Sequence, residues 1–241
     1  MTGSSKTAII TGASSGIGLG LTKALLERGY RVVANSRRIS SSGVLAPSGA
    51  LRLVDGDIGR PETGPLLVET AVSTFGTVDL LVNNAGIFIP KPFTEYTVGD
   101  FQALISTNLA GFFHASQPAV AQMQRQQSGH IVNISTTLAD QPIAGIPAAL
   151  PILTKGGLNA VTRALAIELA PRNIRVNALA AGIIDTPMHK PETHEFLKAL
   201  HPMQRIGKVS EIVDAVAYLT DATFVTGEVL HLDGGAHAGR W

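Results

Sequence analysis

Short apolar segments alternate with longer amphipathic segments along most of this chain. The short segments are rich in β-branched residues and lack a clean apolar-polar alternation, which is typical of strands covered on both faces. They are Thr7–Thr11, Val32–Asn35, Leu51–Val54, Val78–Val82, Ile131–Ser135, Ile174–Leu179 and Glu228–Leu232. The longer segments, with apolar residues at helical spacing, are Ile17–Arg28, Pro65–Phe75, Asp100–Gln126, Thr154–Ala170 and Glu211–Leu219.

Strands that alternate with helices predict a parallel sheet with right-handed crossovers. We therefore expect an α/β fold, with a single Rossmann-type domain over residues 1–241. This domain is a doubly wound parallel sheet of about seven strands flanked by helices. The Ser-, Gly- and Pro-rich segment Arg38–Ala50 predicts a loop in place of the helix after the second strand. Residues 187–205, with several prolines, three histidines and Phe196, predict an irregular substrate flap or a short helix.

Composition excludes several classes of function. The net charge of +1 is too small to indicate a nucleic-acid or anionic-membrane partner. The absence of cysteine excludes disulfides, thiol nucleophiles and cysteine metal sites, and we predict no metal site. The polar segment Met1–Thr7 lacks the apolar core of a secretory signal, and no apolar run has the length of a membrane span. We expect a cytoplasmic protein.

A glycine-rich turn follows the first predicted strand and opens a helix, in the sequence TGASSGIG of Thr11–Gly18. Its glycines permit a tight turn, and the helix N-terminus presents N–H groups and a positive dipole end to phosphate. An ordinary glycine-rich turn is the alternative, because the spacing differs from GxGxxG. The cofactor-binding candidates in this turn are Gly12, Ser14, Ser15, Gly16, Ile17 and Gly18.

The end of the second strand bears on the choice of nucleotide. NAD-binding enzymes usually place an acid there to accept the ribose hydroxyls. This chain has Ser36, Arg37 and Arg38 instead, and a guanidinium suits a 2′-phosphate. The pattern favours NADP(H) over NAD(H), although a solvated basic pair at a loop start would look the same.

With Asn83-Asn84-Ala85-Gly86 after the fourth strand, the chain resembles the short-chain dehydrogenase/reductase family over essentially its whole length. The resemblance implies a nicotinamide-dependent oxidoreductase that acts on a small-molecule carbonyl or alcohol and assembles as a homotetramer or homodimer. The implied cofactor residues also include Asp57, Ile58, Asn84, Ala85, Gly86, Lys155, Gly182, Ile184 and Thr186. The implied catalytic residues are Asn108, Lys155 and a serine whose place falls on Thr136, with Ser135 one residue earlier.

Four of these residues also fit a purely structural role that needs no ligand. Asp57 fits a turn residue, and Asn84 fits a strand-end cap. Asn108 lies in an apolar helical stripe and fits a structural amide. Lys155 fits a lysine that extends from a buried stem to solvent. Neighbouring residues on a strand face opposite sides, so Ser135 and Thr136 cannot both face a substrate.

The chain departs from the family at the position of the catalytic proton donor. The resemblance implies a tyrosine four residues before Lys155, and Pro151 stands there. Proline is tolerated in a first helical turn, and we expect Pro151 at the first helical position of a helix that begins near Leu150. The substitute donors considered are Lys155, a water held by Asn108 and Lys155, and four other side chains, namely Asp140, His189, His194 and His201.

Two functions follow from this departure. One is an NADP(H)-dependent carbonyl reductase or alcohol dehydrogenase with a non-standard proton donor. The other is an NADP(H)-binding protein without redox turnover, which acts as a sensor or partner subunit. For both functions we expect the dinucleotide at the amino edge of the sheet.

Overall fold

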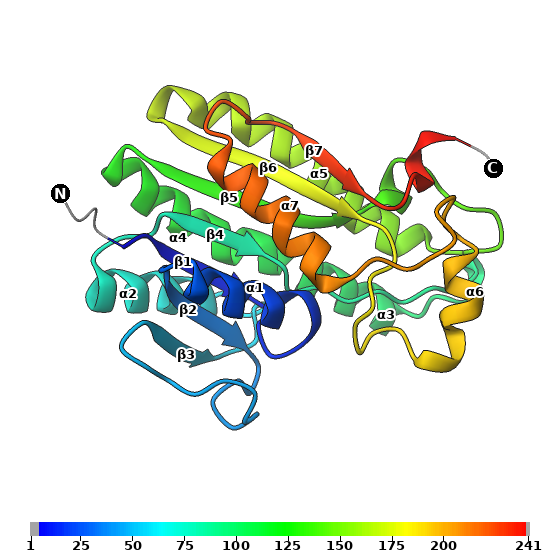
Figure 1. Cartoon of the computed structure of the whole chain (residues 1–241), viewed down its shortest axis with the longest axis horizontal. Coiled ribbons are helices and arrows are strands. Elements are labelled where there is room, and N and C mark those ends of the chain that lie inside the picture. The colour runs from blue at the N-terminus through cyan, green and yellow to red at the C-terminus, as the bar shows by residue number, and fades with distance from the viewer. Residues whose placement is uncertain (1–4, 240–241) are drawn as a thin grey trace.

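All seven predicted strands are present and form one parallel sheet in the computed structural model, which describes residues 5–239. The strand order is β3-β2-β1-β4-β5-β6-β7 (Figure 1). The strands are β1 (Thr7–Thr11), β2 (Arg31–Ser36), β3 (Leu51–Asp55), β4 (Leu80–Asn83), β5 (Gly129–Thr136), β6 (Ile174–Ala181) and β7 (Val229–Leu232). The predicted fold class is confirmed.

Helices cover both faces of the sheet (Figure 1). One face packs against α1 (Gly16–Glu27) and α7 (Val209–Asp221), and the other against α2 (Thr63–Phe75), α4 (Gly111–Gln126) and α5 (Ala149–Leu169). The adjacent β1 residues Ile9 and Ile10 belong to the two opposite cores. Strand side chains alternate between faces, so burial on both sides produces the continuous apolar runs in the sequence.

No helix joins β2 to β3, which confirms the predicted loop over this part of the chain. The two strands still pair in parallel, from Val32 opposite Leu51 to Ser36 opposite Asp55. The loop is anchored by the fully buried side chain of Ile39. The segment that usually holds a crossover helix is therefore replaced by turns fixed at one apolar residue.

The predicted helix Asp100–Gln126 contains a break that the sequence pattern did not reveal. It consists of α3 (Val98–Leu104), the π-helical turn η2 (Ile105–Ala110) and α4 in succession. A capping box between Thr97 and Asp100 starts α3. The π turn carries Asn108, and such turns often occur at functional sites.

The strand order reverses between β1 and β4, and this opens a crevice at the carboxyl ends of the strands. The glycine-rich turn follows β1, so it lies at this carboxyl edge. The expectation of a dinucleotide at the amino edge is wrong for this reason. Beside the crevice, residues 187–205 form the 3-10 turn η5 (Pro191–Thr193) and the short helix α6 (His194–Lys198) within irregular chain.

The described residues contain neither a candidate membrane span nor a candidate metal site. No helix among them is long and apolar enough to cross a membrane. No group of three or more histidine or acidic side chains among them is arranged to hold a metal ion.

Candidate active site

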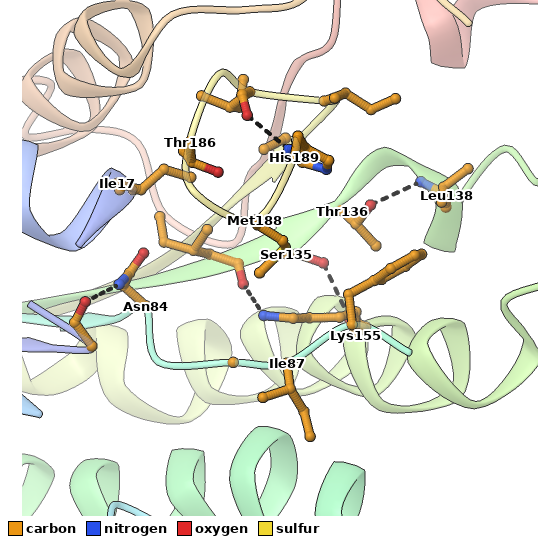
Figure 2. Close-up of a pocket in the computed structure, with 18 of the residues that line it drawn as sticks. Ile17, Asn84, Ile87, Ser135, Thr136, Leu138, Lys155, Thr186, Met188 and His189 are labelled. Atoms are coloured by element: carbon orange, nitrogen blue, oxygen red, sulfur yellow. Dashed lines mark hydrogen bonds between the residues drawn. The ribbon is translucent and has the colours of Figure 1, made fainter. Parts of the chain in front are cut away.

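A cleft of about 780 Å³ lies along the carboxyl edge of the sheet, and Figure 2 shows its inner end. It brings together most of the predicted site residues. These are Gly12, Ser14, Ser15, Gly16, Ile17, Ser36, Arg37, Asp57, Ile58, Asn84, Ala85, Gly86, Ser135, Thr136, Lys155, Gly182, Ile184 and Thr186. Gly18, Arg38 and Asn108 do not line it.

The glycine-rich turn touches the loop after β4. Gly12 has φ +69°, and a Cβ placed on it would lie 2.9 Å from the Cα of Ala85. The Asn84 side-chain amide donates to the carbonyls of Thr11 and Gly12, at 2.9 and 3.2 Å. Asn84 thus ties the two loops together, as the cap interpretation of this residue requires, and also borders the cleft.

The N-terminus of α1 opens onto the cleft. Its N-cap residue Ser15 makes no side-chain capping bond, so the first-turn N–H groups have no partner within the helix or its cap. Gly16 has φ +50°, and a Cβ there would lie 3.2 Å from the Thr186 side chain. Free N–H groups in a cradle with little room for side chains fit the pyrophosphate of a dinucleotide.

The far end of the cleft is bordered by residues from the ends of β2 and β3. Arg37 is exposed and lines the cleft, while the neighbouring Arg38 is exposed outside it. The Asp57 carboxylate accepts a hydrogen bond of 2.9 Å from the Gly59 N–H. Asp57 therefore holds a turn as well as bordering the cleft, and Arg37 is the basic side chain that lines this end.

Lys155 is half-buried at the inner end of the cleft. Its ammonium donates to the Ile134 carbonyl at 2.7 Å (Figure 2). Burial lowers the pKa of Lys155 from 10.5 to about 8. The ammonium is therefore held against β5 at the cleft surface.

Asn108 acts behind the cleft wall as a tether. Its side-chain oxygen accepts from the Ile87 N–H at 2.9 Å, and its side-chain nitrogen donates to the Ile87 carbonyl and the Thr154 hydroxyl, both at 3.0 Å. The π turn, the loop after β4 and α5 are joined through this one amide. These contacts match the structural interpretation, and they fix the loop that carries Gly86.

The hydroxyls of Ser135 and Thr136 have different surroundings. Ser135 donates to the Lys155 backbone carbonyl at 3.2 Å, so its proton is engaged within the fold. Thr136 accepts from the Leu138 N–H at 3.4 Å, and its proton remains available (Figure 2). Of the two, Thr136 has the hydroxyl that is free to donate to a bound carbonyl oxygen.

α5 begins at Ala149, within one residue of the expected start, so Pro151 lies in the first helical turn as predicted. It is the third helical residue, and not the first. The first helical bond runs from the Ile152 N–H to the Ala148 carbonyl at 2.9 Å, so the N–H that proline lacks has no partner to lose. Tyr30, Tyr96 and Tyr218 do not line the cleft, so among the described residues it contains no phenol.

Apolar side chains form one wall of the cleft. Residues 187–205, expected as a substrate flap, contribute to the cleft, and so do several residues of 143–147. The contribution of the loop after β4 was missed, although an apolar run directly after a strand was a usable signal. The apolar side chains that line this wall are Phe88, Pro90, Leu138, Ile143, Ile146, Pro147, Met188, Phe196, Leu197 and Leu200.

Residues 12–237 match the family profile described as Enoyl-(Acyl carrier protein) reductase. The chain is 35% identical to the granaticin polyketide synthase putative ketoacyl reductase 2 of Streptomyces violaceoruber over 242 residues, 95% of each chain. The structure of ElxO with NADP bound superposes with a TM-score of 0.90 at 29% identity, covering 98% of this chain and 100% of that one.

A second solved structure is also similar. The 3-ketoacyl-(acyl-carrier-protein) reductase of Brucella melitensis, complexed with NADH, has a TM-score of 0.89 at 33% identity, with 96% of this chain and 98% of that one covered. Nicotinamide nucleotides thus occupy solved structures that share this fold along nearly its full length. This chain belongs to the short-chain dehydrogenase/reductase family of oxidoreductases.

Proposed function

We propose that the protein is an NADP(H)-dependent oxidoreductase that reduces a small carbonyl compound, or oxidises the corresponding alcohol, with a non-standard proton donor. One observation carries this proposal: a single cleft joins the phosphate-binding turn of Gly12–Ile17 to Thr136 and Lys155. Nucleotide and substrate would thereby meet beside a free hydroxyl and a buried amine.

The residues of the chain have separable tasks in this reaction. A bound nicotinamide supplies the hydride. The α1 N-terminus holds the pyrophosphate, and Ile184 and Thr186 border the nicotinamide end of the cleft. Thr136 donates a hydrogen bond to the carbonyl oxygen and so stabilises negative charge that develops there. Lys155 binds the nicotinamide ribose.

Arg37 supports the preference for NADP(H). Its guanidinium borders the cleft and forms no salt bridge with another described residue, so it is free to pair with a phosphate. The variant Arg37→Glu should weaken NADPH binding at least tenfold and leave NADH binding within threefold, measured by calorimetric titration. Arg38→Glu is the matched control, because Arg38 lies outside the cleft. An equal loss in both variants would contradict a specific role for Arg37.

The apolar wall supports a substrate that is moderately hydrophobic and uncharged. Of the residues that line this part of the cleft, His201 has its pKa lowered mainly by burial, and its Nε2 accepts from the Ile183 N–H at 3.0 Å. It is therefore neutral. The test is NADPH oxidation over a panel of ketones, aldehydes and β-ketoacyl thioesters at high enzyme concentration. Inertness toward all of them, with nucleotide bound, would overturn the proposal.

The competing function is NADP(H) binding without redox turnover, as a sensor or partner subunit. Pro151 is the observation that favours it, because the cleft has no phenol among the described residues. This function predicts tight NADPH binding and no reduction of any carbonyl. Steady-state reduction that collapses in Lys155→Ala would remove it.

We further propose that the protein is cytoplasmic and assembles as a homodimer or homotetramer through α4 and α5. Large apolar side chains stand on the outer surfaces of these helices: Phe113 on α4 is 54% exposed, and Ile167 on α5 is 80% exposed. Exposed apolar side chains on neighbouring helices are typical of a protein interface.

A further inference from the structure

The cleft offers few groups that can deliver a proton to a bound substrate. Five ionisable side chains line it among the described residues, and two of them, Arg37 and Asp57, lie at the end formed by β2 and β3, far along the cleft from Thr136. The remaining three are Lys155, His189 and His201. Asp140 and His194, considered from sequence, do not line the cleft.

Hydrogen bonds exclude one of these three side chains as a proton donor and engage one ring nitrogen of another. The Nε2 atom of His201 accepts from the Ile183 N–H, which fixes the ring as neutral. The Nδ1 atom of His189 lies 2.9 Å from the Ile184 carbonyl and donates to it. His189 sits on the loop that faces Lys155 across the cleft (Figure 2), so it remains a competitor.

Lys155 has the geometry of a proton donor. Its ammonium is anchored to the carbonyl of Ile134, two residues before Thr136 on the same strand. A Cβ on Gly86 would lie 3.0 Å from Lys155 Nζ, so the glycine leaves this side of the amine open. The elements packed around it present the amide of Asn108 and the hydroxyl of Ser135.

The ammonium of Lys155 also has no counter-charge among the described residues. No carboxylate or cation among the described residues perturbs its pKa, and burial alone lowers the value to about 8. An acid with a pKa near 8 is protonated at neutral pH and still releases its proton readily. An arginine at this position would stay charged and would not release a proton.

We propose that Lys155 is the general acid of this protein and replaces the tyrosine whose place Pro151 occupies. This inference rests on the proposed reductase function. During reduction, the carbonyl oxygen held by Thr136 gains an electron pair as the carbon accepts the hydride. An Nζ–H bond of Lys155 then breaks, directly or across one bridging water, and the O–H bond of the alcohol forms. The neutral amine recovers a proton from solvent, and alcohol oxidation runs the same transfer in reverse.

The first test needs no substrate and no nucleotide. Lysine labelled with ¹³C at Cε reports the charge of each side chain by NMR, and the Lys155 resonance is identified by its absence in Lys155→Met. The expected titration midpoint is near pH 8. A midpoint near 10.5, the ordinary lysine value, would overturn the proposal.

The second test is the pH dependence of single-turnover NADPH oxidation with a saturating carbonyl substrate. The wild-type rate should be level below about pH 8 and should fall tenfold per pH unit above it. Lys155→Arg keeps the positive charge and the donors for the ribose. It should retain NADPH binding, followed by fluorescence, yet lose roughly 10²–10⁴ in rate together with the limb near pH 8.

His189→Gln tests the alternative that His189 is the proton donor. A comparable loss of rate in His189→Gln, together with loss of the wild-type pH limb, would assign the proton to His189 and overturn the proposal. If Lys155→Arg turns over with the pH dependence of the wild type, Lys155 is not the proton donor. The proposed reductase function would still stand. A wild-type protein that binds NADPH and reduces no carbonyl would overturn the reductase function as well.

Discussion

At the scale of single residues, Lys155 combines two demands that conflict. Its amine has to lie inside the protein to reach the cleft, and burial without a counter-charge destabilises its charged form. The single described acceptor of Lys155 Nζ is a neutral carbonyl, that of Ile134. The folded protein therefore carries a free-energy cost at neutral pH, as residues at functional sites often do.

This cost predicts that Lys155→Met stabilises the protein. The pKa of Lys155 is about 8 when folded and near 10.5 when unfolded, so between these values the unfolded chain binds more protons. Wild-type stability should therefore rise with pH from about 8 to about 10.5. At about 1.4 kcal/mol per pKa unit, the full effect is about 3 kcal/mol. Lys155→Met should therefore be more stable than the wild type by up to this amount at pH 7. Its stability should not rise between pH 8 and pH 10.5.

The measurement is urea unfolding of both proteins at pH 7 and pH 10. Lys23→Met is the matched control, because Lys23 is exposed on α1 and should leave both values within about 0.5 kcal/mol of wild type. A destabilised Lys155→Met at pH 7 would show that the hydrogen bond to Ile134 outweighs the burial cost.

At the scale of elements, the contact between β1, α1 and the loop after β4 depends on Gly18. This residue lies outside the cleft lining, yet a Cβ on it would stand 2.3 Å from the Gly12 carbonyl oxygen and 2.6 Å from the Asn84 side-chain amide. The carbonyl belongs to the backbone, so the clash is not relieved by a side-chain rotation. Gly18 therefore permits the close approach of helix and turn that creates the phosphate cradle.

Gly18→Ala should displace the turn from the loop that carries Asn84. We expect a loss of about 1–3 kcal/mol in the free energy of unfolding and a loss of NADPH affinity of at least tenfold. Urea unfolding and calorimetric titration measure the two effects. In Gly99→Ala on α3, the new Cβ meets only the Thr97 hydroxyl at 3.6 Å, and stability should be unchanged or higher. Equal effects in both variants would contradict the steric explanation.

The elements and the binding turns could be predicted because their signals are local. Apolar runs fixed the seven strands, and the order of glycines and strands placed the turn of Gly12–Gly18. The π turn at Asn108 could not be predicted, because its stability comes from contacts with Ile87 and Thr154, far away in the sequence. The orientations of Ser135 and Thr136 likewise depend on α5 and η3 (Thr137–Ala139), which no strand pattern records.

At the scale of the whole molecule, large apolar side chains stand uncovered on the outer surfaces of α4 and α5. Ile167 and Leu153 on α5 and Phe113 on α4 are all more than half exposed. Both helices pack their other faces on the sheet through Ala119, Met123 and Leu169. An amphipathic helix normally directs one apolar face inward and a polar face to water, so a second apolar surface on two helices favours a partner copy.

Ile167→Glu should therefore shift the protein from a dimer or tetramer toward a monomer without unfolding it. A charge on a side chain that is 80% exposed costs little in the monomer, whereas burying it without a partner in an interface costs several kcal/mol. Sedimentation velocity at micromolar concentration measures the change in mass, and circular dichroism checks the fold. The control is Leu66→Glu, on α2, where the side chain is 45% exposed and no partner is proposed. A wild-type protein that sediments as a monomer, or an equal shift in both variants, would place the interface elsewhere or remove it.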